Sequence, residues 1–83
     1  MNIAFDEDGW DDYTSRADNP KMLQRINRMI NEASHDPGFG IGKPERLRGN
    51  LSGYWSRRID QEHRLVYTVR GKEIVIASAR HHY

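Results

Sequence analysis

The most reactive side chains of this sequence are a carboxylate near its middle and two histidines at its end. Glu45 is flanked by basic residues, which favour its ionised form, so that it could accept a proton. His81 and His82 precede the last residue, and histidine can donate a proton to a departing oxygen near neutral pH. Acid–base chemistry is one interpretation. A loop carboxylate in a salt link and surface histidines are the ordinary alternatives.

Three arginines lie close together in the second half of the chain, at positions 57, 58 and 64. Strand alternation places Arg57 on the side with the better core residues and Arg58 on the opposite side. Arg64 shares the side of Arg58 if the loop between their strands has an odd number of residues or a bulge. Two facing arginines repel unless an anion lies between them, which predicts an anion site. Neutralisation by Asp60 and Glu62 is the structural alternative.

The sequence does not favour a metal ion or another cofactor. It has no cysteine and no pair of histidines at a typical ligand spacing, and alternation along a strand separates His81 from His82. Gly38, Gly40 and Gly42 lack the Lys-Ser/Thr sequence of a phosphate-binding loop and do not lead from a predicted strand into a helix. We therefore expect a flexible connector at these glycines and no cofactor.

The charges are unevenly distributed along the chain. Residues 1–42 contain four Lys or Arg and eight Asp or Glu, a net charge of −4, whereas residues 43–83 contain nine and four, a net charge of +5. The basic half predicts a surface that faces a polyanion, and a solvated mixture of charges is the alternative.

Length and composition restrict the class of protein. Eighty-three residues suffice for one hydrophobic core, so we expect residues 1–83 to form a single domain. The absence of cysteine suits a reducing cytoplasm, and no apolar run approaches the length needed to span a bilayer. These features predict a cytoplasmic protein without a membrane anchor.

The hydrophobic pattern predicts the elements that would position these side chains. A short strand is expected at residues 2–5, followed by a helix from about Glu7 that directs Trp10, Tyr13 and Ala17 to one side. Asn19 and Pro20 predict the start of a second helix, because asparagine caps well and proline is tolerated in the first turn. β-Branched and aromatic residues predict three strands, at residues 54–59, 64–69 and 73–80.

Together these elements predict an α+β fold. The sheet is expected to be twisted and mostly antiparallel, with both N-terminal helices packed on one face and the other face left as a shallow groove. Glu45 is expected in the loop before the sheet, and the basic side chains would point into the groove.

Several long stretches resemble a known family when they are taken together. The segments "KPERLRGNLSGYWSRRIDQEHRLVYTV" and "ARHHY", with "WDDY" at residues 10–13, resemble the YoeB toxins of bacterial toxin–antitoxin systems, within the RelE-like superfamily. The resemblance covers essentially the whole chain. It implies a microbial-ribonuclease-like fold and an enzyme that cleaves mRNA in the ribosomal A site without metal, through a 2′,3′-cyclic phosphate.

The resemblance also implies roles for individual residues. Glu45 would be the general base, His82 the general acid, and Arg64 would stabilise the charge on the phosphorane. Tyr83 would complete the catalytic set by positioning or stacking on a base. The phosphate-binding residues would be Arg58, Lys43 and Arg57.

Partners follow from the same resemblance. It implies a cognate antitoxin of the YefM type that covers the groove or displaces the terminal strand, and it is compatible with a homodimer. The alternative function is a non-catalytic RNA-binding or protein-binding domain that has kept the fold. Fold likeness alone does not decide between an enzyme and a binding module.

Overall fold

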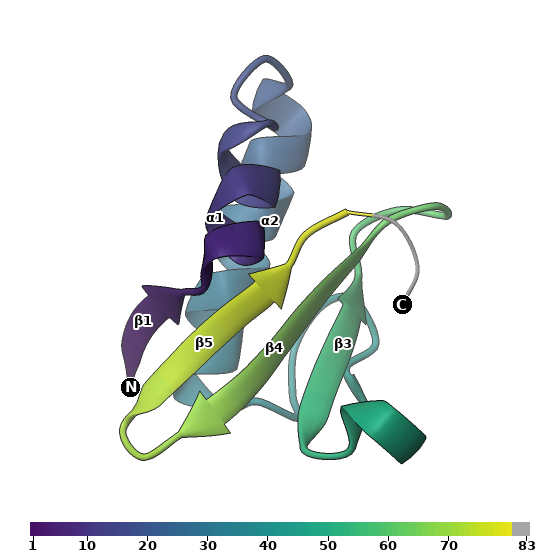
Figure 1. Cartoon of the computed structure of the whole chain (residues 1–83). Helices are drawn as coiled ribbons and strands as arrows, with labels where there is room; N and C mark the ends of the chain where they lie inside the picture. The colour runs from purple at the N-terminus through teal and green to yellow at the C-terminus, as the bar shows by residue number, and fades with distance from the viewer. Residues whose placement is uncertain (81–83) are drawn as a thin grey trace.

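The computed structural model describes residues 1–80 of the chain, as two helices and a five-stranded sheet (Figure 1). The strand order is β1-β5-β4-β3-β2, in which β1 runs parallel to β5 and the other pairs are antiparallel. The predicted α+β fold with a mostly antiparallel sheet is confirmed. The elements are β1 (Asn2–Phe5), α1 (Glu7–Thr14), α2 (Pro20–His35), β2 (Glu45–Arg46), a short 3-10 helix (Gly49–Leu51), β3 (Tyr54–Arg58), β4 (Arg64–Arg70) and β5 (Glu73–Ser78).

Helix α1 begins where Asp6 caps it, since the Asp6 carboxylate accepts a hydrogen bond of 2.8 Å from the Gly9 amide. The helix packs closely on the end of β5. A Cβ atom added to Gly9 would lie 2.0 Å from the carbonyl oxygen of Ile76, so only glycine fits there. The sequence predicts Ala17 on the same side of this helix as Trp10 and Tyr13. α1 ends at Thr14, however, so Ala17 lies outside the helix.

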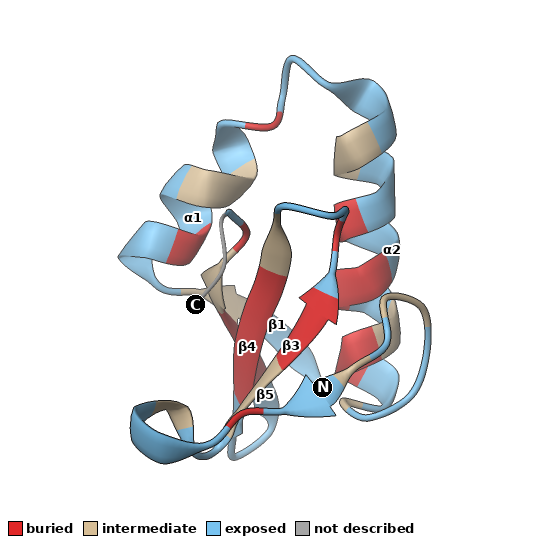
Figure 2. Cartoon of the chain, turned by 90° about the vertical axis from the view of Figure 1, so that its right-hand side faces the viewer, coloured by how far each residue is buried: buried red, intermediate tan, exposed pale blue. Residues whose placement is uncertain are grey.

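Helix α2 provides one side of the hydrophobic core. Asn19 caps it by accepting a hydrogen bond of 3.2 Å from the Met22 amide, as the sequence predicts. Its apolar stripe is buried against the sheet, and Figure 2 shows the buried segments of α2 facing the strands. Burial of each large aliphatic side chain contributes about 1.5–3 kcal/mol. The core joins Ile26, Met29, Ile30 and Ala33 of α2 to Leu65, Tyr67, Ile74 and Ile76 of the sheet.

The register of the sheet brings the basic residues of β3 and β4 together. Arg58 and Arg64 are direct cross-strand partners, because the loop between them has five residues, an odd number. Glu45 is paired with Ser56 in the two-residue edge strand β2, where the sequence predicts a loop. β5 ends at Ser78 rather than at the predicted residue 80.

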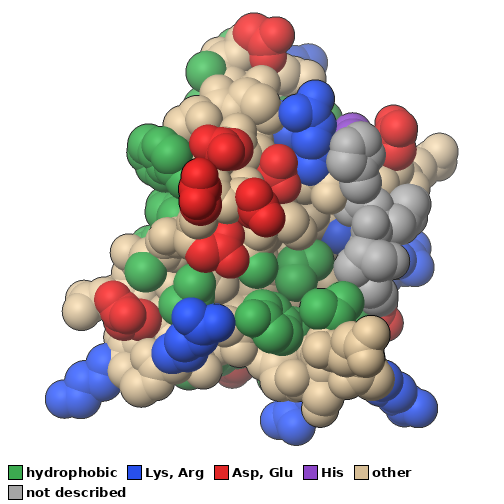
Figure 3. All heavy atoms as spheres, viewed as in Figure 1, with side chains coloured by type: hydrophobic (Ala, Val, Ile, Leu, Met, Phe, Trp, Pro, Cys, Tyr) green, Lys and Arg blue, Asp and Glu red, His purple; other side chains and the backbone are tan. Residues whose placement is uncertain are grey.

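Several acidic side chains of the first half of the sequence lie together on the surface. Figure 3 shows Asp and Glu side chains gathered over α1, and the helix contributes Glu7, Asp8, Asp11 and Asp12. Within residues 1–80, neither helix is both long and apolar enough to cross a membrane.

Candidate active site

An ion pair between two strands forms the centre of the candidate site. The Nη1 atom of Arg64 on β4 donates a hydrogen bond of 3.0 Å to Oε1 of Glu45 on β2. The same nitrogen donates to Oγ of Ser56 on β3, at 3.3 Å. The Arg64 side chain is 14% exposed and that of Glu45 is 54% exposed, so the guanidinium is fixed beside a carboxylate that solvent reaches.

Ser56 is a member of this site that the sequence prediction missed. It is fully buried, and its pairing with Glu45 and with Val66 places it between β2 and β4. The available signal was strand alternation, which puts residues 56 and 58 on the same face.

Arg58 adds a second positive charge next to Arg64. Its side chain is exposed, and a hollow of about 250 Å³ is lined by Arg58, Asp60, Gln61 and Arg64. Positive charges on neighbouring strands attract an anion into such a hollow. The anion site predicted from the sequence stays a prediction, because the Asp60 carboxylate lines the same hollow.

The loop from residue 60 to residue 63 is held by Asp60. Burial raises the pKa of the Asp60 carboxyl, but hydrogen bonds from the backbone amides of His63 and Glu62 outweigh burial and lower the pKa overall. Glu62 lies 3.7 Å from Nε2 of His63. The ion pair between Arg64 and Glu45 is separate from these contacts within the loop.

A basic rim continues from Glu45 along the edge of the sheet. Lys43 is exposed and has a positive φ of 50° in the turn before β2. A hollow of about 840 Å³ is lined by Glu45, Arg46, Leu47 and Arg48. The guanidinium of Arg46 lies 5.0 Å from the centre of the Trp55 ring, a cation–π contact. Arg46 and Arg48 were not among the predicted binding residues.

Arg57 requires a correction. The sequence prediction includes it among the phosphate-binding residues, but it lies on the opposite face of β3 and is fully buried. Its Nε atom donates to the hydroxyl of Tyr67 at 2.9 Å, and Nη2 donates to the carbonyl oxygen of Phe39 at 2.8 Å. A guanidinium that has no accessible surface does not contact RNA in this conformation.

Two predicted catalytic residues, His82 and Tyr83, lie outside the described residues, as does His81. The structure shows how the chain leading to them is held. The amide of Ala79 donates to Oδ2 of Asp12 at 3.1 Å, and its carbonyl oxygen accepts a bond of 2.9 Å from Nη2 of Arg16. A helical carboxylate and a buried arginine therefore fix both backbone groups of Ala79.

The described residues give no indication of a metal centre. In residues 1–80, no group of three or more histidines or carboxylates is placed to hold an ion. What the site does bring together is a partly exposed carboxylate, a fixed guanidinium and a second cation. This arrangement can accept a proton and stabilise negative charge next to it.

This fold is that of a class of small bacterial toxins. The "YoeB/ParE toxin from Agrobacterium tumefaciens" superposes with a TM-score of 0.95 at 41% identity, over 100% of both chains. A YoeB chain from Staphylococcus aureus, solved in complex with YefM and as a dimer, superposes with a TM-score of 0.89 at 46% identity, over 100% of this chain and 98% of that one.

Sequence comparison identifies the family within this class. The family model of the YoeB-like toxin of bacterial type II toxin–antitoxin systems matches residues 5–83, and the chain belongs to this family. Toxin YoeB of Synechocystis is 54% identical over 84 residues, which cover 100% of this chain and 98% of the relative. The predicted family is confirmed.

Proposed function

We propose that this toxin is an endoribonuclease that cleaves mRNA in the ribosomal A site by metal-independent acid–base catalysis. The observation that carries the proposal is the 3.0 Å contact between Glu45 and Arg64 on a sheet face that also presents Arg58. RNA contains its own nucleophile, the 2′-hydroxyl, so the protein needs only a base, an acid and fixed positive charge.

In the proposed reaction, Glu45 and His82 each carry out one proton transfer. A Glu45 oxygen accepts the proton of the 2′-hydroxyl while O2′ attacks the adjacent phosphorus. The bond from phosphorus to O5′ breaks, and His82 donates a proton to O5′. The products are a 2′,3′-cyclic phosphate and a free 5′-hydroxyl.

Arg64 and Arg58 supply the electrostatic part of this mechanism. Negative charge accumulates on the non-bridging oxygens of the phosphorane, and preoriented cations stabilise it without reorganisation. A carboxylate has about four lone-pair sites, so Glu45 can accept a hydrogen bond from Arg64 and still accept a proton. The base and the charge that stabilises the transition state are thus side by side.

RNA binding is assigned to the edge of the sheet next to Glu45. Lys43, Arg46 and Arg48 are exposed there and would contact the phosphate backbone. Tyr83 would stack on a base, a contact worth about 1–3 kcal/mol.

The proposal extends to partners and location. The relative from Staphylococcus aureus was solved with YefM and as a dimer. We assign this toxin a YefM-like antitoxin, the ribosome as its site of action and a cytoplasmic location, and a homodimer agrees with the dimeric relative. The antitoxin would cover the Glu45–Arg64 face.

A cleavage assay tests the proposal. Toe-printing on programmed ribosomes is expected to show a cut in the A-site codon with the parent toxin and none with Glu45→Ala or His82→Ala, while both variants still bind ribosomes. A binding module would act equally well with either substitution. Uncut mRNA in the presence of ribosome-bound parent toxin would refute the enzyme and favour that alternative.

A further inference from the structure

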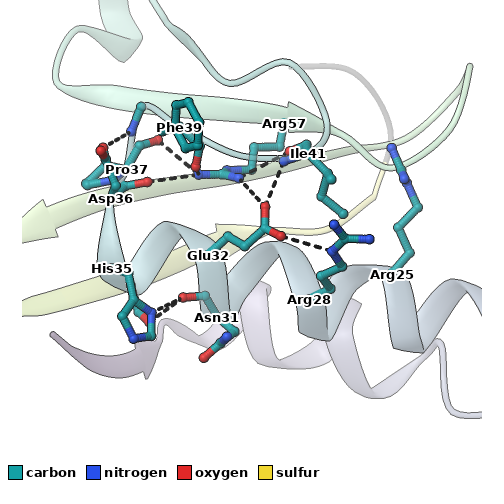
Figure 4. Close-up of polar contacts among 12 residues, drawn as sticks. Arg25, Arg28, Asn31, Glu32, His35, Asp36, Pro37, Phe39, Ile41 and Arg57 are labelled. Carbon is teal, nitrogen blue, oxygen red and sulfur yellow. Dashed lines mark hydrogen bonds and ion pairs between the residues drawn. The ribbon is translucent and has the colours of Figure 1, made fainter.

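Arg57 is the most extensively bonded buried side chain described in the structure, and the reaction proposed above does not use it. It is fully buried, and its guanidinium lies among carbonyl groups of the segment that follows α2 (Figure 4). Besides Phe39, it donates to the carbonyl oxygens of Ile41 at 3.2 Å and Asp36 at 3.0 Å. Oε1 of Glu32 lies 3.7 Å from its Nη1 atom.

The segment held in this way, residues 36–42, is also bound by other groups around Arg57. Glu32 accepts a hydrogen bond of 2.7 Å from the Ile41 amide, and the Tyr67 hydroxyl donates to the carbonyl oxygen of Pro37. The carbonyl oxygen of Gly42 accepts a bond of 2.6 Å from the Arg58 amide. The glycine-rich segment that the sequence predicts to be a flexible connector is therefore bound along most of its length.

The end of this segment leads directly to the candidate base. Glu45 lies three residues after Gly42, in an edge strand of two residues. So short a strand has few backbone hydrogen bonds to its neighbour. On its C-terminal side, the Leu47 amide donates a hydrogen bond of 2.9 Å to the carbonyl oxygen of Tyr54. The position of Glu45 consequently depends on anchors on both sides, and residues 36–42 form the anchor that precedes it.

We propose that Arg57 is a positioning residue, which fixes residues 36–42 against β3 and so holds Glu45 at its distance from Arg64. The inference rests on the proposed function of Glu45 as general base. Strand alternation gives β3 both tasks: Arg57 supports the segment from the core side, and Ser56 and Arg58 on the other side form the site.

Arginine suits this role better than lysine does. A guanidinium has five N–H donors in a rigid planar fork, which match several carbonyl oxygens at once. A lysine ammonium keeps the charge but has three donors on a flexible stem. Arg57→Lys therefore preserves the charge beside Glu32 and removes the geometry.

Single-turnover cleavage of programmed ribosomes tests the inference in two backgrounds. In the parent toxin, Arg57→Lys is expected to lower the maximal rate about 10-fold or more, because small misplacements of a catalytic group are costly. The half-saturating ribosome concentration should stay within about twofold. In the Glu45→Gln background, Arg57→Lys should lower the residual rate by no more than about twofold. If Arg57 acts by positioning Glu45, its substitution has little left to remove once the Glu45 carboxylate is gone.

Two further variants keep the test decisive if Arg57→Lys folds poorly. Tyr67→Phe removes only the hydroxyl that binds Arg57 and Pro37, and a smaller fall in rate with the same dependence on Glu45 is expected. Ile26→Val is the control, because it loosens the core and an isoleucine side chain makes none of the hydrogen bonds that hold residues 36–42. It should lower the melting temperature and leave the maximal rate unchanged.

Amide exchange gives a readout that does not depend on cleavage. The Ile41 and Arg58 amides are expected to exchange faster in Arg57→Lys than in Ile26→Val. Equal falls in rate with and without Glu45, or unchanged exchange at both amides, would overturn the inference and leave the proposed function standing. Full cleavage by Glu45→Gln alone would instead overturn the proposed function, and the inference with it.

Discussion

Glu45 and Arg64 are 19 residues apart in the chain, and their side chains form a hydrogen bond of 3.0 Å. The contact exists because β3 pairs with β2 on one edge and with β4 on the other, so that Ser56 lies between the two residues. A carboxylate and a guanidinium are thereby held on one surface by three strands. The predictions below test this arrangement and the elements that support it.

Replacing Arg64 is expected to abolish most of the activity. Arg64→Met should lower the cleavage rate roughly 10²–10³-fold, since it removes a preoriented charge from the transition state. Cells that express this variant without antitoxin should keep growing. Growth curves and ribosome cleavage assays measure both effects.

Arg70→Met is the matched control for Arg64. Arg70 is an exposed arginine on the same strand, and its Nη2 atom lies 3.4 Å from the Tyr54 hydroxyl. The Arg70→Met toxin should arrest growth as the parent toxin does. Arrest of equal strength by Arg64→Met would count against the role assigned to Arg64.

The lowered pKa of Glu32 predicts that the stability of the fold depends on pH. Hydrogen bonds from the Ile41 amide and from Arg28 hold its pKa below the ordinary value of 4.5. A carboxyl whose pKa is lower in the folded state stabilises the fold above its unfolded pKa, and the stabilisation is lost as the pH falls through the folded pKa. The parent should therefore lose stability below about pH 4.5.

Glu32→Gln should weaken that dependence. Its melting temperature should be lower than that of the parent at pH 7, and the difference should shrink as the pH falls below the folded pKa. Thermal unfolding followed by circular dichroism at several pH values measures this. Parallel curves for the two proteins would show that Glu32 does not contribute in the predicted way.

The contact between Arg16 and Ala79 is expected to stabilise the end of β5. Arg16→Met leaves the buried carbonyl of Ala79 without the 2.9 Å bond, and an unsatisfied buried acceptor costs about 1–3 kcal/mol. Urea unfolding should show a loss of that size. Arg28→Met, which removes an exposed ion pair, should cost less than about 1 kcal/mol. Equal losses in the two variants would contradict the assignment.

Gly9→Ala separates helix propensity from packing. Propensity alone predicts that alanine stabilises a helix by about 1 kcal/mol relative to glycine. The Cβ atom, however, would lie 2.0 Å from the Ile76 carbonyl oxygen, and overpacking of this kind costs about 1–3 kcal/mol. Packing should prevail, so the melting temperature should fall. A rise would mean that α1 can shift away from β5.

Much of the fold follows from local signals in the sequence. Asn19 and Pro20 define the start of α2, and the β-branched and aromatic residues of β4 and β5 indicate the two strands. Strand β2 was not predictable in this way, because two residues show no periodicity and Glu45 and Arg46 are both exposed. Its existence depends on pairing with β3, which is a tertiary contact.

The site was predictable in part, and for different reasons at each residue. Alternation and an odd loop length are enough to place Arg58 opposite Arg64. The proximity of Glu45 to Arg64 came from family resemblance, because no local pattern relates residues 19 positions apart. Alternation also placed Arg57 on the core side correctly, and its complete burial argues against the phosphate-binding role that the resemblance implied. Its partners are backbone carbonyls of residues 36–42, which no side-chain pattern reveals.

The central claim is that the RNA supplies the nucleophile while Glu45 removes its proton. The most direct measurement uses ribosomes programmed with an mRNA that carries a single 2′-deoxynucleotide on the 5′ side of the scissile phosphate. The toxin should leave this mRNA intact and should cut the all-ribose mRNA to a 2′,3′-cyclic phosphate and a 5′-hydroxyl. Cleavage of both mRNAs at the same rate would contradict the account.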